Sequence, residues 1–331
     1  MSKITCTSKQ SGDEADVARG IQLLPVLWNA CVFFAGEDRN DKGQIMEYNI
    51  DDKAWNSIDI PCCGSESYAL TTYHEKLLLI GGYSKEINGQ CNKVWEFDED
   101  GRTFKDSSLP PLPETKECRT ISATSEGDLL VVICKDLEQN ILVNIFDGNK
   151  NWITHPQPNN LRISSSDSVS VMICDALVYL VHQDRNKSSY SIYQASLQSL
   201  KDETISSSSS WEKIIPDPPK YNHSNLVFVQ NRMLLFASST CQSTLAFIYS
   251  PEYKCWNEIG EFGVEFNISP SYPVSISAVS LPKNQVLVMG WVKGKETRED
   301  NFVRCGPPSF EVLLLQPQGE YIKCEPNYVH V

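Results

Sequence analysis

Residues 67–113 read SYALTTYHEKLLLIGGYSKEINGQCNKVWEFDEDGRTFKDSSLPPLP. The first seven residues alternate in the manner of a strand, and the turn residues His74-Glu-Lys76 follow them. Leu77–Ile80 is a short, wholly apolar run that ends at the pair Gly81-Gly82. A strand that is apolar on both faces is buried on both faces, so the second strand of this unit is predicted to be central.

Two further strands complete the unit. A polar loop leads to a third run around Trp95-Glu-Phe97, and the turn Asp98-Glu-Asp-Gly101 leads to a fourth run near Phe104. Turn residues separate all four runs, which predicts a four-stranded antiparallel meander.

The same order of runs recurs along the chain. An aromatic residue marks the fourth strand at intervals of 45 to 65 residues, and each is expected to follow a strand-like run with a Tyr or Phe near its middle. The marker residues are Trp55, Phe104, Trp152, Trp211, Trp256 and Tyr321. Repeats of this length that consist of short strands are typical of a β-propeller.

The predicted fold is therefore all-β, a six-bladed β-propeller of four-stranded antiparallel blades over residues 20–325. Residues 1–19 are expected to form an N-terminal extension, and residues 326–331 a tail or a closing strand. Polar loops account for the longer intervals, including the serine run 206–210, which is expected to be a flexible loop.

Composition limits the possible partners. The net charge is −13, from 29 basic and 42 acidic side chains, and no basic cluster opposes it. Nucleic acids and anionic membranes are therefore not expected to bind. The N-terminus lacks the apolar core of a signal peptide, and several of the 12 cysteines, such as Cys31, Cys134 and Cys174, fall in predicted strands. We expect a cytoplasmic protein with buried thiols.

The unit at 67–113 resembles the Kelch repeat, through its apolar run, double glycine, aromatic third strand and fourth-strand aromatic. The resemblance implies structural roles for Gly81, Gly82, Trp55, Trp95, Phe104, Trp152, Trp211 and Trp256. In the third and fourth units, Cys134-Lys135 and His182-Gln183 replace the glycine pair. Kelch-like proteins often act as adaptors, so the resemblance implies a protein-interaction module with Kelch architecture.

No catalytic or metal motif is recognisable. The five histidines form no HxH or HExxH pair, and neither a P-loop nor a GxSxG motif occurs. We therefore expect no enzyme activity, no cofactor and no metal. The alternative is a metal-dependent or galactose-oxidase-like propeller enzyme that uses the same loops.

The predicted function is non-catalytic binding of a partner protein or peptide at the loop-rich mouth of the propeller. The partner-binding candidates are Tyr68, Tyr83, Arg119, Asp167, His223 and Tyr272, which lie in loops or at strand starts expected at this mouth. Arg119 ranks first because a guanidinium offers a planar fork to a carboxylate and is weakly hydrated. The protein is expected to be a monomer or part of a larger multidomain protein.

The metal-enzyme alternative predicts bound metal, whereas the binding function does not. Elemental analysis of the purified protein is expected to find no stoichiometric copper, iron or zinc. One equivalent of any of these metals would instead support the enzyme.

Overall fold

The structure is a computed structural model with two compact units. One unit comprises residues 1–41, 46–57 and 221–331, and the other comprises residues 42–45 and 58–220. The described residues are 22–37, 43–49, 52, 54–60, 68–84, 89–113, 119–136, 138–149, 151–164, 167–184, 189–201, 211–214, 216–219, 224–229, 232–240, 243–250, 252–262, 274–281, 285–296, 303–305 and 309–314.

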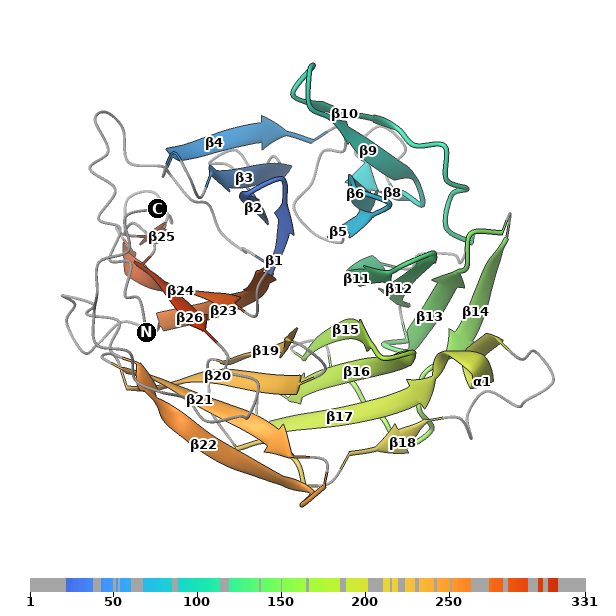
Figure 1. The fold of residues 1–331 in the computed structure, drawn as a ribbon. Helices are drawn as coiled ribbons and strands as arrows, with labels where there is room; N and C mark the ends of the chain where they lie inside the picture. The colour runs from blue at the N-terminus through green and yellow to red at the C-terminus, as the bar shows by residue number, and fades with distance from the viewer. Residues whose placement is uncertain are drawn as a thin grey trace. The chain divides into compact units, whose positions relative to one another are not determined.

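Three complete four-stranded sheets lie in the unit formed by residues 42–45 and 58–220 (Figure 1). We call each such sheet a blade and number the blades in chain order. Blade 2 contains β5 (Tyr68–Tyr73), β6 (Lys76–Gly81), β9 (Val94–Asp98) and β10 (Thr103–Asp106), with the small hairpin β7 (Tyr83–Ser84) and β8 (Gly89–Gln90) between β6 and β9. Blade 3 contains β11 (Arg119–Glu126), β12 (Leu129–Lys135), β13 (Ile141–Phe146) and β14 (Trp152–Pro156). Blade 4 contains β15 (Ser168–Cys174), β16 (Leu177–Asp184), β17 (Ser189–Ser196) and β18 (Glu212–Lys213), and the helix α1 (Leu197–Lys201) follows β17.

The remaining strands repeat this meander. Blade 1 contains β1 (Gln22–Trp28), β2 (Cys31–Glu37), β3 (Gly43–Asn49) and β4 (Ala54–Asp59), whose residues are divided between the two units. Blade 5 contains β19 (Ser224–Val229), β20 (Arg232–Thr240), β21 (Ser243–Ser250) and β22 (Cys255–Phe262). The last sheet contains β23 (Val274–Leu281), β24 (Gln285–Glu296), β25 (Val303–Cys305) and β26 (Ser309–Leu314). The β1–β2 pair and the strand pairs of blades 2–5 and of the last sheet are antiparallel, as the sequence predicts.

The prediction of six four-stranded blades is wrong in number, because the described residues form five. In the last sheet, β24 pairs with β26 over 285–290 and with β25 at Lys293 and Glu296. Both later strands therefore occupy the same edge of β24, and the sheet is three strands wide. The fourth strand predicted at Tyr321 lies outside the described residues, as do the predicted extension 1–19 and tail 326–331.

The second strand of blade 3 contributes to two hydrophobic cores at once. Leu130, Val132 and Cys134 pack with residues of β6 in blade 2, such as Leu78 and Ile80. The intervening Val131 and Ile133 face blade 4 and pack against residues of β15 and β16. Successive side chains of a strand point to opposite faces, so one buried strand joins three blades. The burial of Cys31, Cys134 and Cys174 that the sequence predicts is confirmed.

The first strands of neighbouring blades are also joined. The β11 strand lies beside both β5 and β15. The Ser125 hydroxyl donates to the carbonyl of Thr72 in blade 2, and the backbone N–H of Val171 in blade 4 donates to Ser122 Oγ at 3.2 Å. A bulge in β11 falls between Thr120 and Ser122, where such an irregularity redirects the side chains that follow.

An aromatic pair recurs between the third and fourth strands. In three blades the two rings face each other in register, with centroid separations of 5.2–5.3 Å and interplanar angles of 44–50°. The pairs are Phe97–Phe104, Phe146–Trp152 and Tyr249–Trp256. Such cross-strand contacts are the unit of sheet stabilisation.

Two tryptophans of the repeat pack between neighbouring blades. Trp152 packs on the core shared by blades 2 and 3, and its Nε1 donates to the carbonyl of Pro110 at 3.2 Å. Trp211 packs on the core shared by blades 3 and 4. Trp95 is buried, whereas the side chain of Trp55 on β4 is outside the described residues.

Gly81 and Gly82 form the bend at the end of the second strand of blade 2. Their φ angles are 79° and 116°, in the region that glycine adopts without steric cost. Gly81 N–H donates to the carbonyl of Lys93, and the Gly82 carbonyl accepts from Cys91, so the chain leaves the second strand through a fixed bend.

Tight turns join the first and second strands, and several use left-handed residues other than glycine. The pairs Asn29-Ala30, His74-Glu75 and Asp175-Ala176 have positive φ at both positions, as in a type I′ turn. Blade 3 has Gly127 at the first of these positions, with φ 58°.

Replacing Ala176 with glycine is expected to stabilise the protein by about 0.5–1 kcal/mol. A left-handed residue with a Cβ costs roughly 1–2 kcal/mol, and the greater freedom of glycine in the unfolded chain offsets part of the gain. Ala176 is exposed, and its carbonyl accepts from Leu197 N–H at 2.9 Å, so the turn is held in place. Denaturant unfolding measures the change.

The matched reverse substitution is Gly127→Ala. A Cβ added at Gly127 meets no atom within 4 Å, so the backbone conformation alone determines the cost. This variant is expected to lose about as much stability as Ala176→Gly gains. Unchanged unfolding midpoints in both variants would contradict the argument.

Candidate functional site

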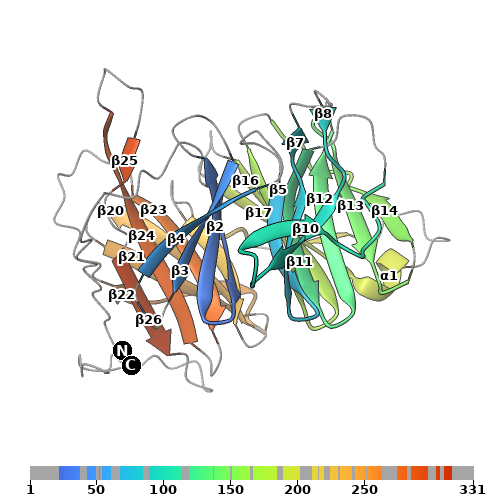
Figure 2. The same ribbon diagram turned by 90° about the horizontal axis from the view of Figure 1, so that it is seen from above.

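The two edges of blades 2–4 differ in their connections. We call the edge where first strands begin and second strands end the loop edge, and the edge where the first strand turns into the second the turn edge. Turns of two residues close the turn edge between the first and second strands, at 74–75, 127–128 and 175–176. At the loop edge the second and third strands are joined by longer segments, such as 82–93 and 136–140. Figure 2 shows the β7–β8 hairpin at the loop edge and α1 at the turn edge.

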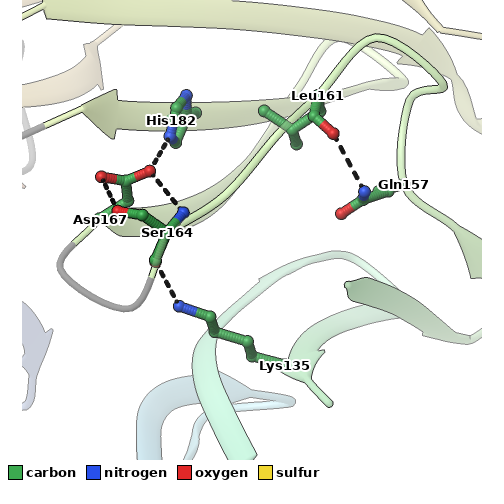
Figure 3. A network of polar contacts seen from close by, with 6 residues as sticks. All are labelled: Lys135, Gln157, Leu161, Ser164, Asp167 and His182. Carbon is green, nitrogen blue, oxygen red and sulfur yellow. Dashed lines mark hydrogen bonds and ion pairs between the residues drawn. The ribbon is translucent and has the colours of Figure 1, made fainter. Parts of the chain in front are cut away.

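A buried carboxylate organises the loop edge of blade 4. Asp167 Oδ2 accepts the backbone N–H of Ser164 at 2.8 Å, and Oδ1 accepts the Ser164 hydroxyl at 2.7 Å. Asp167 Oδ2 also lies 2.9 Å from Nε2 of His182 near the end of β16 (Figure 3). The side chains of His182 and Asp167 are only 9% and 4% exposed. These contacts attach Ser164 to the blade that follows it.

The hydrogen bonds of Asp167 also set its charge state. Burial by itself raises the pKa of the Asp167 carboxyl, but hydrogen bonds from the Ser164 backbone, the His182 ring and the Ser164 hydroxyl lower the pKa, as does the charge of His182. Their combined effect holds the pKa of Asp167 below its usual value of 3.8. The carboxylate is therefore ionised at neutral pH and can only accept, so Nε2 of His182 carries the shared proton.

A lysine joins Ser164 to the preceding blade. Lys135, the last residue of β12, donates from Nζ to the carbonyl of Ser164 at 2.9 Å (Figure 3). Beside it, Gln157 Nε2 donates to the carbonyl of Leu161 at 3.1 Å, and Gln157 Oε1 accepts the N–H of Ile141 at 2.8 Å. The connection between blades 3 and 4 is thus held at several points.

Asp136 and Asn140, at the two ends of the connection between β12 and β13, are bonded to each other. Asp136 Oδ1 accepts the N–H of Asn140 at 2.7 Å, and Asp136 Oδ2 accepts the Asn140 amide at 3.0 Å. The Asp136 N–H donates in turn to the carbonyl of Asn140 at 3.0 Å. The loop edge of blades 3 and 4 therefore holds two hydrogen-bonded pairs, Asp136 with Asn140 and Asp167 with Ser164, and the nearby residues Glu138 and Arg162 are exposed.

The structure separates the predicted binding residues. Tyr68 is 2% exposed, and its hydroxyl donates to the carbonyl of Gln44 at 3.4 Å, so the expectation of an exposed Tyr68 ring is wrong. Its position at the start of a strand that is buried along nearly its whole length explains the burial. Tyr83 lies on β7, and Arg119 begins β11 opposite Lys135, so both backbones lie at the loop edge as predicted. The side chains of Tyr83 and Arg119 are outside the described residues, as are His223 and Tyr272.

Asp167 does lie at the loop edge, but both of its oxygens are occupied within the chain. Its role in binding a partner stays a prediction. Sequence reasoning did not identify His182, Ser164 or Lys135 as members of this network. The spacing Ser164-x-x-Asp167 was a usable signal, because Asp and Ser side chains at such spacings bond to nearby backbone groups.

The described residues include no group of three or more His, Cys, Asp and Glu that could hold a metal ion. Within the same residues, no helix has the length and apolar character needed to cross a membrane.

The chain was compared with known proteins. It matches no protein-family profile and no curated protein. Among solved structures, it is similar to the SapL1 lectin in complex with alpha methyl fucoside, with a TM-score of 0.52 and 10% identity over 84% of this chain and 94% of the lectin chain. At this identity the likeness concerns the fold alone. Together with the four-stranded antiparallel blades, it supports a β-propeller.

The network around Asp167 predicts an acid-dependent loss of stability. A group whose pKa is lowered by folding stabilises the protein above its unfolded pKa, and this contribution disappears as the pH falls through the folded pKa. Asp167→Asn is therefore expected to cost about 1–3 kcal/mol at pH 7, because an amide cannot accept all three hydrogen bonds. The difference from the unmodified protein should shrink below about pH 4.

Urea unfolding between pH 3 and pH 7 measures this difference. Asp100→Asn, in an exposed turn, is the matched control and should change stability little at any pH. If Asp167→Asn lowered the free energy of unfolding by the same amount at pH 3 and pH 7, an ionised Asp167 would not be the source of the stabilisation.

Proposed function

We propose that this chain is a non-catalytic binding module that holds a partner protein or peptide segment at the loop edge of its blades. The observation that carries the proposal is the asymmetry between the two edges of blades 2–4. The connections from second to third strands and from one blade to the next lie at the loop edge, with the bonded pairs Asp136–Asn140 and Ser164–Asp167. At the turn edge, two-residue turns join the first and second strands, and the connection that begins with α1 joins β17 to β18. Binding residues commonly lie on loops that a rigid scaffold positions.

The order within these loops favours binding. A loop that is already fixed loses little conformational entropy when a partner binds to it. The unfavourable free energy of ordering the loop is therefore small, and the affinity is higher. The carboxylates of Asp136 and Asp167 fix one turn each. Their side chains therefore act as supports, and neighbouring residues would make the contacts with a partner.

The contacting groups at this edge are of mixed charge. Arg162 and Glu138 are exposed, and Lys135 is half-buried. Arg119 begins β11 beside Lys135 in the same pair of strands. Arginine is enriched among the residues that dominate binding energy, and mixed charges favour a partner with complementary charges over a nucleic acid. Arg119 and Arg162 are the proposed principal contacts.

A relation to the Kelch family is part of the proposal. The support is the positive-φ pair Gly81-Gly82 after a buried second strand, and the aromatic pair that recurs between third and fourth strands. A cytoplasmic adaptor that acts without catalysis is consistent with these features and with the acidic composition.

Arg119→Ala is expected to weaken binding of the partner by on the order of 2 kcal/mol, or about 30-fold, if Arg119 is a principal contact. The unmodified protein first serves as bait to identify a captured partner. Titration of that partner then compares Arg119→Ala and Arg162→Ala with the unmodified protein.

Lys76→Ala is the matched control, because Lys76 is a half-exposed cation at the turn edge that pairs with Glu96 at 2.9 Å. It should leave the affinity unchanged. Equal affinities for all variants would move the binding site away from the loop edge. A loss of affinity in Arg119→Ala that comes with an equal loss of thermal stability would make Arg119 structural.

Methyl α-fucoside is titrated in parallel, and binding of this sugar alone would replace the protein partner with a carbohydrate.

A further inference from the structure

Two Asp-Gly dipeptides occupy corresponding turns in neighbouring blades. Asp100-Gly101 lies between β9 and β10, and Asp147-Gly148 lies between β13 and β14. Both turns join a third strand to a fourth strand. In such a dipeptide the backbone nitrogen of glycine can attack the preceding side-chain carboxyl, because glycine has no Cβ to hinder the approach. The two turns therefore offer the same reaction in two different settings.

The carboxyl group of Asp100 is not held in place. Its side chain is exposed, and no hydrogen bond or ion pair to it is present among the residues that the structure describes. A backbone hydrogen bond spans the dipeptide, from the N–H of Arg102 to the carbonyl of Glu99, and its length is 3.3 Å. An exposed turn with a long hydrogen bond opens at a small free-energy cost, so Asp100 can reach the conformation in which its carboxyl meets the Gly101 nitrogen.

The carboxyl group of Asp147 is held by its neighbour. Asp147 is half-buried, and its Oδ1 accepts the backbone N–H of Asn149 at 3.2 Å and the Asn149 amide at 2.9 Å. The glycine itself is not obstructed, because a Cβ added at Gly148 would lie 3.8 Å from its nearest neighbour. The bonds to Asn149 must break before the carboxyl can turn toward the Gly148 nitrogen, and these bonds distinguish the two sites.

We propose that Asp100 is a site of spontaneous isoaspartate formation and that Asn149 protects Asp147 from the same reaction. The inference does not depend on the binding function proposed above. The strand registers place both turns at the turn edge of their blades, away from the proposed binding loops.

The reaction needs no co-reactant other than water. The Gly101 nitrogen forms a bond to Asp100 Cγ, and the carboxyl hydroxyl leaves as water together with the proton of the Gly101 N–H. Water then opens the cyclic imide. Attack at Cγ restores aspartate, whereas attack at the main-chain carbonyl carbon gives isoaspartate, in which the backbone runs through Cβ and Cγ. No oxidation or reduction occurs, and the mass of the chain is unchanged.

Isoaspartate would change the hairpin that contains it. The backbone is lengthened by the Asp100 Cβ carbon at a point that the bond between Arg102 and Glu99 spans. The hairpin is closed beside this turn by the pair Asp98–Thr103, so the end of β9 and β10 is where the modified chain should lose order. The product is a substrate of the class of carboxyl methyltransferases that repair isoaspartate.

The first experiment ages the full chain at neutral pH and body temperature. Trypsin then releases Asp100 in the peptide 94–102 and Asp147 in the peptide 136–150, and mass spectrometry identifies isoaspartate by its diagnostic backbone fragments. Isoaspartate should accumulate about tenfold faster at Asp100, a rate effect of the size expected from the hydrogen bonds that restrain Asp147. Products of Asn88-Gly89 fall in the separate peptide 86–93. Equal rates, a faster reaction at Asp147, or no isoaspartate at Asp100 would overturn the proposal.

Two variants test the assigned roles. A Cβ at Gly101 would lie 3.2 Å from Oδ2 of Asp98, whose side chain is 34% exposed and can shift, so Gly101→Ala should fold. This variant should form no isoaspartate at position 100. Asn149→Ala removes the amide bond to Asp147 and should raise the rate there several-fold. Isoaspartate at position 100 of Gly101→Ala at the unmodified rate would overturn the assigned reaction, and an unchanged rate at Asp147 in Asn149→Ala would overturn the protection.

The same measurement in urea separates the fold from the local sequence. In the unfolded chain both dipeptides lose their turns, and the two sites should react at similar rates. A tenfold difference that persists in urea would assign the effect to flanking residues and overturn the role of the turns. Circular dichroism before and after ageing confirms that the chain aged without urea is folded.

Discussion

A second strand that is buried on both faces constrains the rest of this molecule. In blade 3, alternate side chains of β12 enter the core shared with blade 2 and the core shared with blade 4. An ionised side chain in the middle of such a strand would have no water and no room for a partner. In the second strands of blades 3 and 4, the charged or titratable side chains are therefore found toward the strand ends, as Lys135 and His182 are. Their partners Ser164 and Asp167 lie in the connection between the two blades.

Much of the fold could be predicted from local sequence. Four short runs, a wholly apolar second run and a double glycine predicted the strands of blade 2 and the bend at Gly81 and Gly82. The repeat pattern predicted an aromatic residue on the third and fourth strands, and the structure adds that these rings pack in register across the two strands. The number of four-stranded blades could not be predicted in the same way. The pairing of β25 and β26 with the same edge of β24 depends on the length of β24, and the repeat pattern does not encode that length.

The candidate site was less predictable for a physical reason. The strand starts at Tyr68 and Arg119 and the position of Asp167 follow from the order of strands, so their placement at one edge could be inferred. Whether a side chain at that edge is exposed depends on neighbours that are remote in sequence. Tyr68 is covered and bonds to Gln44, while Asp167 is bound by Ser164 and His182. His182 lies at the position that a glycine of the pair occupies in blade 2. A repeat pattern that expects glycine there gives no reason to select His182 as a site residue.

The serine contacts of β11 make blade 3 dependent on blade 2 and blade 4, which precede and follow it in the chain. Ser125 bonds to the blade before and Ser122 to the blade after, so blade 3 is complete only when both are folded. Structures in which each repeat contacts its neighbours gain stability along the chain, and a folded segment lowers the cost of adding the next. Blades 2, 3 and 4 should therefore behave as one cooperative segment. A duplicated or deleted repeat within this segment would leave hydroxyl and amide groups without the partners that now satisfy them, so any change in blade number is constrained by these small polar contacts as well as by the cores.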